Sequence, residues 1–281
     1  MLTVYAPAKV NLVLEVLGKD NDYHRISSIV QSIDLCDVLS FEPDEEICLE
    51  CAEPSLKHDN LVTRAAILLK ESTKCTLGAR IELRKHIPWG VGLGGGSSDA
   101  AASLLALNEL WGLRLSLSEL VSLASKLGSD VPFFIRRGTA LVEGKGEKVT
   151  PLPSLPATWF VLLVPPVPRI LDKTKQMYGR LNAAHYTNGR FVQKARSSLR
   201  QGKGIAPDLM FNVFEKVAFD FFAGLDKYRN TLEETGAPGV YVAGSGPCLF
   251  TFSSGEEEAG ELFSHLKKQR LECYLASSLP R

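Results

Sequence analysis

The chain has 281 residues, of which 45% are hydrophobic and 23% are charged, with 32 basic residues against 32 acidic ones. These values are typical of one large or two modest globular domains, and they exclude collagen-like and intrinsically disordered chains. Because binding to nucleic acid requires a cationic face, a formal net charge of zero argues against a nucleic-acid partner.

The cysteines and the apolar runs favour a cytoplasmic protein. Six cysteines are too few for a disulfide-stapled secreted chain, and Cys48 and Cys51 lack a second pair at zinc spacing. We therefore expect no metal held by protein ligands of this kind. No basic segment precedes an apolar run at the start, and the apolar stretch 159–164 ends at two prolines. These patterns predict neither a signal peptide nor a membrane partner.

Strands are expected early in the chain. Residues 10–16 alternate between apolar and other side chains, and residues 79–87 do the same. This period of two predicts half-buried strands in both segments. Residues 25–41 and 46–51 also look extended.

Helices are expected between and after these strands. One should begin after Asn60, which is a favourable N-cap, and another should span 99–111. Ser116 and Glu119 have the spacing of a capping box for a third helix. Asp130 stands before a short fourth helix, which it could cap.

Prolines at 151, 153 and 156 mark a domain boundary. We therefore expect an N-terminal domain over 1–153 and a C-terminal domain over 154–281. In the second domain, strands and helices should alternate: strands near 159–164, 240–242, 248–252 and 271–275, and helices near 173–181, 207–235 and 256–269.

Five glycines lie within the seven residues 90–96, directly before Ser97 and Ser98. Glycines let a backbone approach a ligand closely, and the first amides of the following helix carry partial positive charge, as in phosphate-binding loops. A tight turn with Ser97 or Ser98 as N-cap is the structural alternative. The polar face of 79–87 argues against a dinucleotide-binding site, and the lack of a lysine after Gly96 excludes a Walker A loop.

Five segments together carry a resemblance to a known family: Pro7–Leu12, Tyr23–His24, Pro88–Ser98, Leu127–Pro132 and Gly244–Gly246. In this order they resemble the GHMP kinase superfamily, and within it the branch that phosphorylates 4-diphosphocytidyl-2-C-methyl-D-erythritol. The resemblance covers nearly the whole chain. It implies an α+β fold of two domains, with the active site in the cleft between them. One departure is Asp22, where the family usually has glycine.

The resemblance also implies an activity. ATP, with Mg²⁺, would phosphorylate the 2-hydroxyl of this cytidine-diphosphate-linked sugar alcohol in non-mevalonate isoprenoid precursor biosynthesis. Asp130 would be the base that takes the hydroxyl proton, and Lys9 would keep Asp130 ionised and neutralise the transferring phosphoryl group. The partners implied are small molecules, with the protein a monomer or a weak homodimer.

Two sets of binding residues follow from the resemblance. Tyr23 and Tyr178 would stack on the two faces of the cytosine, while His24 reads its polar edge. The other substrate-binding residues implied are Asn11, Thr174, Gly244 and Ser245. ATP would lie against Asn60, Pro88, Trp89, Gly90, Val91, Gly92, Leu93, Gly94, Gly95, Gly96, Ser97 and Ser98.

Other functions remain open at this point. A GHMP kinase for homoserine or a mevalonate derivative would have no base to stack, so Tyr23, His24 and Tyr178 argue against it. A non-catalytic nucleotide-binding regulator would not need Lys9 and Asp130. A dehydrogenase is weakened by the polar strand before the glycines.

Overall fold

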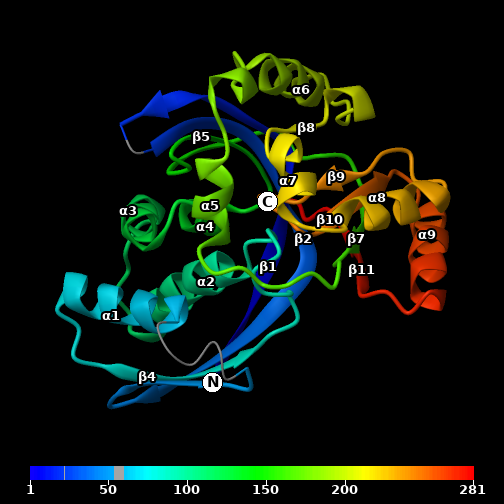
Figure 1. The fold of residues 1–281 in the computed structure, drawn as a ribbon. Coiled ribbons are helices and arrows are strands. Elements are labelled where there is room, and N and C mark those ends of the chain that lie inside the picture. The colour runs from blue at the N-terminus through cyan, green and yellow to red at the C-terminus, as the bar shows by residue number, and fades with distance from the viewer. Residues whose placement is uncertain (22, 54–59) are drawn as a thin grey trace. The chain divides into compact units, whose positions relative to one another are not determined.

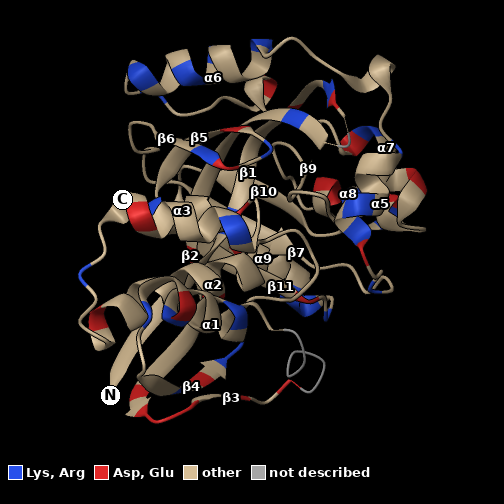
Figure 2. Cartoon of the chain, turned by 90° about the vertical axis from the view of Figure 1, so that its left-hand side faces the viewer, with Lys and Arg blue, Asp and Glu red and all other residues tan. Residues whose placement is uncertain are grey.

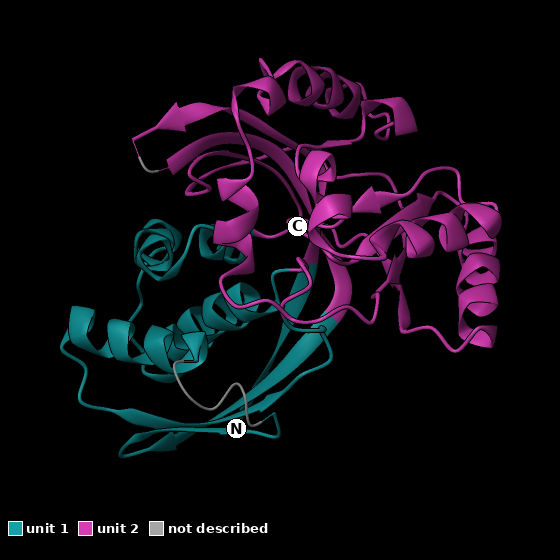
Figure 3. Ribbon diagram, viewed as in Figure 1, with its two compact units in different colours: residues 1–8, 36–89, 94–136 teal, residues 9–35, 90–93, 137–281 magenta. Residues whose placement is uncertain are grey.

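A computed structural model describes residues 1–21, 23–53 and 60–281, so Asp22 lies outside the described residues (Figure 1). The chain divides into two compact units (Figure 3). Unit 1 comprises 1–8, 36–89 and 94–136, and unit 2 comprises 9–35, 90–93 and 137–281. The units interleave along the chain because strands β1 (Leu2–Asp20) and β2 (Tyr23–Asp44) each contribute to both. The mixture of sheets and helices confirms the α+β class, while the boundary at 153/154 stays a prediction.

The strands of unit 1 confirm the predicted alternation. Strand β4 (Gly78–Arg84) is antiparallel to β2 and parallel to β3 (Ile47–Cys51). Ile81 and Leu83 are buried, whereas Arg84 is exposed. This sheet therefore has one apolar face and one polar face.

The helices of unit 1 are α1 (Leu61–Thr73), α2 (Gly95–Leu110), α3 (Leu117–Leu127) and α4 (Val131–Arg136). Helix α2 packs against the other three, so it is the centre of this layer. Both predicted caps are confirmed: Asn60 accepts a hydrogen bond from the Val62 amide at 2.8 Å, and Ser116 forms the capping box with Glu119. Among the described residues, no helix is long and apolar enough to cross a membrane.

Strands β3 and β4 belong to a 7-stranded sheet in the order β3-β4-β2-β1-β8, so β1 lies between β2 and the short parallel strand β8 (Phe211–Asn212). Strand β2 also pairs with β5 (Thr139–Gly144), which forms a hairpin with β6 (Lys148–Pro151). The prediction of a half-buried β1 is wrong, because the strand is buried on both faces from Ala6 to Val16. Even Glu15 is covered, and it accepts a hydrogen bond from the Val192 amide at 2.8 Å.

The second sheet belongs to unit 2 and is antiparallel, in the order β11 (Cys273–Ser277), β7 (Trp159–Leu163), β10 (Leu249–Ser253) and β9 (Tyr241–Val242). Phe160 and Phe250 are fully buried in it. Helix α9 (Glu256–Lys268) packs on β7, β10 and β11, and α8 (Leu225–Glu234) packs on β10.

The other helices of unit 2 are α5 (Lys173–Gly179), α6 (Arg190–Arg200) and α7 (Glu215–Phe221), with 3-10 turns at Ala183–His185 and Pro207–Leu209. The prediction of one helical stretch over 207–235 is wrong. Asn212 keeps the chain extended there, because its side chain accepts from the Phe214 amide and donates to the carbonyl oxygens of Val242 and Gly244.

Candidate functional site

The first glycine loop, Pro88–Gly94, connects β4 to α2. It leaves unit 1 at Trp89, passes through unit 2 and returns at Gly94. Gly90, Gly92 and Gly94 have φ angles of +74°, +101° and +76°, a region that favours glycine. The backbone conformation of the loop therefore favours glycine at each of these three positions.

Unit 2 holds this loop closely. The Lys9 amide donates to the Leu93 carbonyl at 3.0 Å, and the Cys248 amide donates to the Val91 carbonyl at 3.2 Å. A Cβ atom on Gly92 would lie 2.0 Å from the carbonyl oxygen of Ala243, so no other residue fits there. The loop is thus fixed to β1 on one side and to the segment before β10 on the other.

Helix α2 begins at Gly95, four residues earlier than predicted, with Gly94 as its N-cap. Ser97 and Ser98 therefore lie inside the first turn, and the structural alternative in which one of them is the N-cap is wrong. The Ser98 hydroxyl is buried with no hydrogen-bond partner in the described part of the chain, whereas Ser97 is half-buried. The first turn thus offers the Ser97 hydroxyl and helix-end amides, such as that of Gly96, to an anion.

An acid–lysine cluster, formed by the half-buried Lys85 and the buried Asp37 and Asp99, supports this turn. The Lys85 ammonium donates to Asp99 at 2.8 Å and also to Asp37. Asp37 accepts from the amides of His86 and Ile87, at 2.6 and 2.9 Å. Burial alone would lower the pKa of Lys85, but Asp99 and Asp37 raise it; burial also raises the pKa of Asp99. The cluster ties the end of β4 to the start of α2.

In unit 2, four predicted site residues come together around a second glycine loop, Gly244–Gly246. The Lys9 ammonium donates to the Asn11 amide oxygen at 2.5 Å, and the Asn11 amide group donates to the Ser28 hydroxyl at 2.9 Å. A Cβ atom on Gly244 would lie 3.1 Å from Lys9 Nζ and 2.7 Å from the carbonyl oxygen of Gly92. Lys9, Asn11, Gly92 and Gly244 are therefore neighbours.

Helix α5 holds the second glycine loop in place. The Lys173 ammonium donates to the carbonyl oxygen of Gly246, and the hydroxyl groups of Thr174 and Ser245 lie 3.0 Å apart in a hydrogen bond. The start of α5 therefore contacts this loop, which adjoins Lys9, at Ser245 and at Gly246. Thr174 and Ser245, both predicted site residues, are direct partners.

Sequence reasoning missed Lys173, which is only 8% exposed. Burial and the neighbouring Lys9 lower its pKa to about 7; Arg169 acts in the same direction and Cys248 against it. One signal was available in the sequence. Met177 lies four residues further along the helix and is buried, so Lys173 shares its inward face.

His24 is the centre of an aromatic group in unit 2. Its ring stacks on Tyr178, with centroids 5.0 Å apart and an interplanar angle of 20°, and Tyr186 meets it edge-on at 5.9 Å. Burial, assisted by Lys19, lowers the pKa of His24, which favours a neutral ring. The His24 Nε2 atom is buried and has no hydrogen-bond partner within the described residues, so it suits the polar edge of a base.

Tyr23 is not part of this stack. It is 57% exposed, and the Lys145 ammonium lies 3.8 Å from the centre of its ring. The structure thus brings His24, rather than Tyr23, against Tyr178. A cytosine between Tyr23 and Tyr178 stays a prediction.

The remaining predicted residues belong to unit 1. Asp130 is exposed and directly precedes α4, and Trp89 is 43% exposed. Asn60 caps α1, and its contact with adenine stays a prediction. Because Lys9 belongs to unit 2 and Asp130 to unit 1, their pairing also stays a prediction.

A protein-built metal cage is absent from the described residues, since no three His, Cys, Asp or Glu side chains gather there. Mg²⁺ needs no such cage, because it binds through one or two oxygen ligands, substrate phosphates and water. The exposed Asp130 carboxylate and the half-buried Ser97 hydroxyl are oxygen donors of this kind. The donor set therefore fits a phosphate-bound Mg²⁺.

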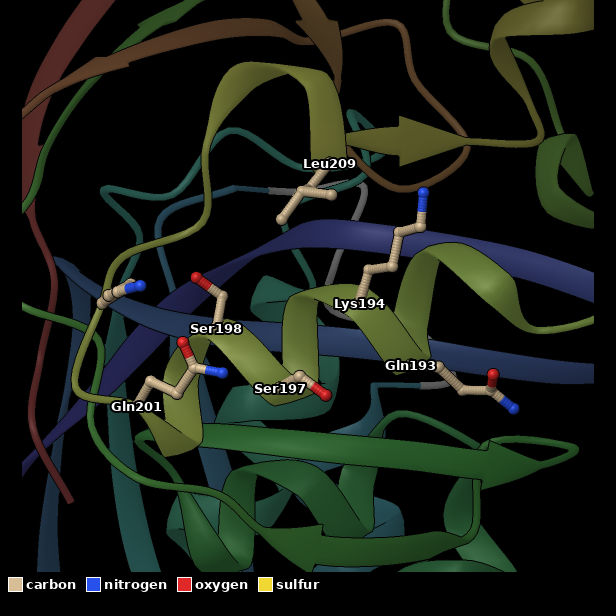
Figure 4. A pocket seen from close by; sticks show the side chains of 7 residues that line it. Gln193, Lys194, Ser197, Ser198, Gln201 and Leu209 are labelled. Carbon is tan, nitrogen blue, oxygen red and sulfur yellow. The ribbon is translucent and has the colours of Figure 1, made fainter.

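A pocket of about 430 Å³ lies along α6 (Figure 4). Its residues come from a part of the sequence that contains none of the site residues described so far. The residues that line it include two lysines: Gln193, Lys194, Ser197, Ser198, Gln201, Lys203 and Leu209. None of these is a predicted site residue. Figure 2 shows several stretches of the α6 ribbon in the blue of Lys and Arg.

Known proteins resemble the chain over its full length. Relatives named 4-diphosphocytidyl-2-C-methyl-D-erythritol kinase include one from Dehalococcoides mccartyi, 44% identical over 281 residues with 99% of each chain covered. Another, from Symbiobacterium thermophilum, is 40% identical over 277 residues, covering 97% of this chain and 98% of the relative.

Solved structures agree. A crystal structure of 4-(cytidine 5'-diphospho)-2C-methyl-D-erythritol kinase has a TM-score of 0.84 at 33% identity, with 99% of each chain covered. Homoserine kinase from Cytophaga hutchinsonii has a TM-score of 0.77 at 18% identity, covering 99% of this chain and 94% of that one, and shows the same fold. Family models for the GHMP kinases N terminal domain and the GHMP kinases C terminal domain match residues 60–138 and 193–271. The chain belongs to the GHMP kinase family.

Proposed function

We propose that this kinase transfers the γ-phosphoryl group of ATP to the 2-hydroxyl of 4-diphosphocytidyl-2-C-methyl-D-erythritol, in non-mevalonate isoprenoid precursor biosynthesis. The grouping of Lys9, Asn11, Gly92 and Gly244 carries the proposal. It puts a cation and an amide beside two close-packed glycines, and phosphoryl transfer depends on such positioning and charge stabilisation. The relatives at 40–44% identity bear the name of a kinase for this acceptor.

Lys9 and Asp130 would share the chemistry. Asp130 takes the proton of the acceptor hydroxyl, and Lys9 offsets the charge that develops on the transferring phosphoryl group. The phosphates of ATP lie against the first turn of α2, where Ser97 and the helix-end amides face them. Mg²⁺, when bound, neutralises part of the phosphate charge, with Asp130 and Ser97 as its candidate protein ligands.

Recognition of the acceptor rests on the group around His24. The neutral ring of His24 presents Nε2 to the polar edge of the cytosine, and Tyr178 offers a stacking face. Acceptors without a base, such as homoserine and mevalonate, gain nothing from these side chains. We also place this enzyme in the cytoplasm, as a monomer or a weak homodimer.

An ADP-release assay tests the proposal directly. The full chain is incubated with ATP, Mg²⁺ and one of three acceptors: 4-diphosphocytidyl-2-C-methyl-D-erythritol, homoserine or mevalonate. We expect ADP release that depends on the cytidylyl acceptor alone. Release with another acceptor would overturn the acceptor assignment, and silence with all three would overturn the activity.

Asp130→Ala tests the base in the same assay. Loss of a positioned general base reduces kcat by at least about 10²-fold. Glu261→Ala removes an exposed carboxylate from α9 and serves as the matched control. Turnover by Asp130→Ala at the rate of that control would rule out Asp130 as the base.

A further inference from the structure

Lys173 occupies a place that is unfavourable for a cation. Only 8% of the residue is exposed. It is also the first residue of α5, where the helix dipole disfavours positive charge. A buried charge is costly unless it is paired. The recorded partner of its ammonium is the neutral carbonyl oxygen of Gly246. A lysine so placed in the folded protein calls for a functional explanation.

The charged side chains around Lys173 further disfavour its protonated form. Lys9 faces it from β1, and Arg169 from the segment before α5; both lower its pKa, which burial brings to about 7. Cys248, from the segment before β10, acts the other way, but burial and Glu272 raise the pKa of that thiol to about 12, so it is neutral. Among the described residues, no carboxylate is found to offset the charge of Lys173.

The basic residues gather at both glycine loops. Lys173 holds Gly246, while Lys9 Nζ lies 3.1 Å from where a Cβ on Gly244 would stand. A Cβ on Gly90 would lie 3.8 Å from the Cδ atom of Arg169. Backbone that must be glycine, next to three cations, is suited to a phosphate group, which would bring the missing negative charge.

We propose that Lys173 binds a phosphate group of the bound nucleotide, beside Lys9 and the second glycine loop. This inference rests on the proposed function, because a nucleotide supplies the phosphate. In the free protein, Lys173 holds the loop through Gly246. The lysine ammonium has three donors, so a phosphate oxygen can be added to this contact.

Phosphate binding by Lys173 changes the number of bound protons, which a purely structural role of this lysine would not do. A phosphate beside Lys173 raises its pKa, because opposite charge favours the protonated form. At a pH above the pKa of the free protein, binding must therefore take up a proton. A lysine that merely holds the loop would bind no additional proton.

Isothermal titration calorimetry of the full chain measures this proton. At about pH 8.5, where Lys173 of the free protein is mostly neutral, each probe is titrated in two buffers of different protonation enthalpy. The probes are ATP, cytidine diphosphate and inorganic pyrophosphate. We expect uptake of about one proton for at least one probe. Uptake with ATP alone assigns the phosphate to the donor, and uptake with cytidine diphosphate alone assigns it to the acceptor.

Variants complete the test. Lys173→Met should abolish the uptake and weaken binding by about ten- to one-hundredfold, the usual effect of losing a charged hydrogen bond. Lys173→Gln keeps a donor for Gly246 without the charge and should also lose the uptake. Lys175→Met removes an exposed lysine from the same helix and should behave as wild type.

Two results would overturn the inference: no proton uptake by wild type with any probe, or affinity and uptake unchanged in Lys173→Gln. The ADP-release assay separates this result from the proposed function. Turnover without lysine-dependent uptake removes the inference alone. Uptake without turnover removes the proposed activity and leaves the phosphate site.

Discussion

Two lysines, Lys85 of unit 1 and Lys173 of unit 2, differ in how their charge is compensated. Lys85 of unit 1 is enclosed with Asp37 and Asp99, and the two carboxylates raise its pKa. Lys173 of unit 2 lies near Lys9 and Arg169, and its pKa falls to about 7. Burial disfavours the charge of both side chains, so the difference comes from the neighbours.

The comparison separates a structural charge from a binding charge. The charge of Lys85 is already compensated in the free protein, because Asp37 and Asp99 accept its hydrogen bonds. These contacts fasten the start of α2. Lys173 lacks an anionic partner among the described residues, and a ligand can supply one. A lysine enclosed between two carboxylates therefore indicates a structural role, whereas a buried lysine next to other cations indicates a binding site for an anion.

Lys85→Met should produce the largest effect. It leaves Asp37 and Asp99 buried without a cation, which costs about 3–5 kcal/mol in the free energy of unfolding. Urea unfolding measures this value. Arg84→Met, at the exposed neighbouring residue, should change it by less than about 0.5 kcal/mol. Equal stability of the two variants would show that the acid–lysine cluster does not fasten α2.

Lys9→Met should lower kcat at least about 10²-fold, because it removes a charge that stabilises the transferring phosphoryl group. It should also raise the pKa of Lys173, whose charge Lys9 opposes. Lys268→Met, at the exposed end of α9, is the control. The ADP-release assay measures the first effect, and a kcat close to that of the control would contradict the role of Lys9.

Lys173→Met should stabilise the ligand-free protein at low pH, the opposite of Lys85→Met. Because the pKa of Lys173 is lower in the folded state, the unfolded chain binds more protons between about pH 7 and 10.5. The wild-type protein therefore gains stability as the pH rises through this window, and the full cost applies below it. The pKa difference corresponds to about 5 kcal/mol, and the lost hydrogen bond to Gly246 offsets about 1.5–3 kcal/mol of it. We therefore expect the variant to be more stable by about 2–3 kcal/mol at about pH 6, with the gain lost at high pH. A pH-independent difference in urea unfolding would contradict this account.

Tyr178→Ala should have the smallest effect. It removes the stacking face next to His24 and should raise KM for the cytidylyl acceptor about tenfold, without changing KM for ATP. Tyr178→Phe keeps the ring and should resemble wild type. If both KM values rise together in Tyr178→Ala, the residue supports the fold rather than the base.

Local signals in the sequence predicted local structure well. The alternation in β4 and the capping box of α3 depend on neighbouring residues alone, and both are confirmed. Lys9, Asn11, Gly92 and Gly244 were named from the family resemblance, and the fold brings them together.

Features that depend on distant contacts were not predicted. The burial of Lys9 and Glu15 arises because β1 is covered on both faces, which its alternating pattern does not show. Helix α6 was missed because its face toward the core is short, with Val192, Ala195 and Leu199 buried. The sequence did not predict Lys173 as a site residue, because its partners come from other segments of the chain.

The pKa of Lys173 tests the central claim most directly. Nuclear magnetic resonance of lysine side chains, assigned with Lys173→Met and Lys85→Met, would follow both groups in the free protein and with ATP or cytidine diphosphate bound. We expect Lys173 to titrate near 7 in the free protein and at higher pH with at least one of the two nucleotides, while Lys85 remains protonated throughout. A Lys173 pKa near 10.5 that neither nucleotide changes would contradict the account.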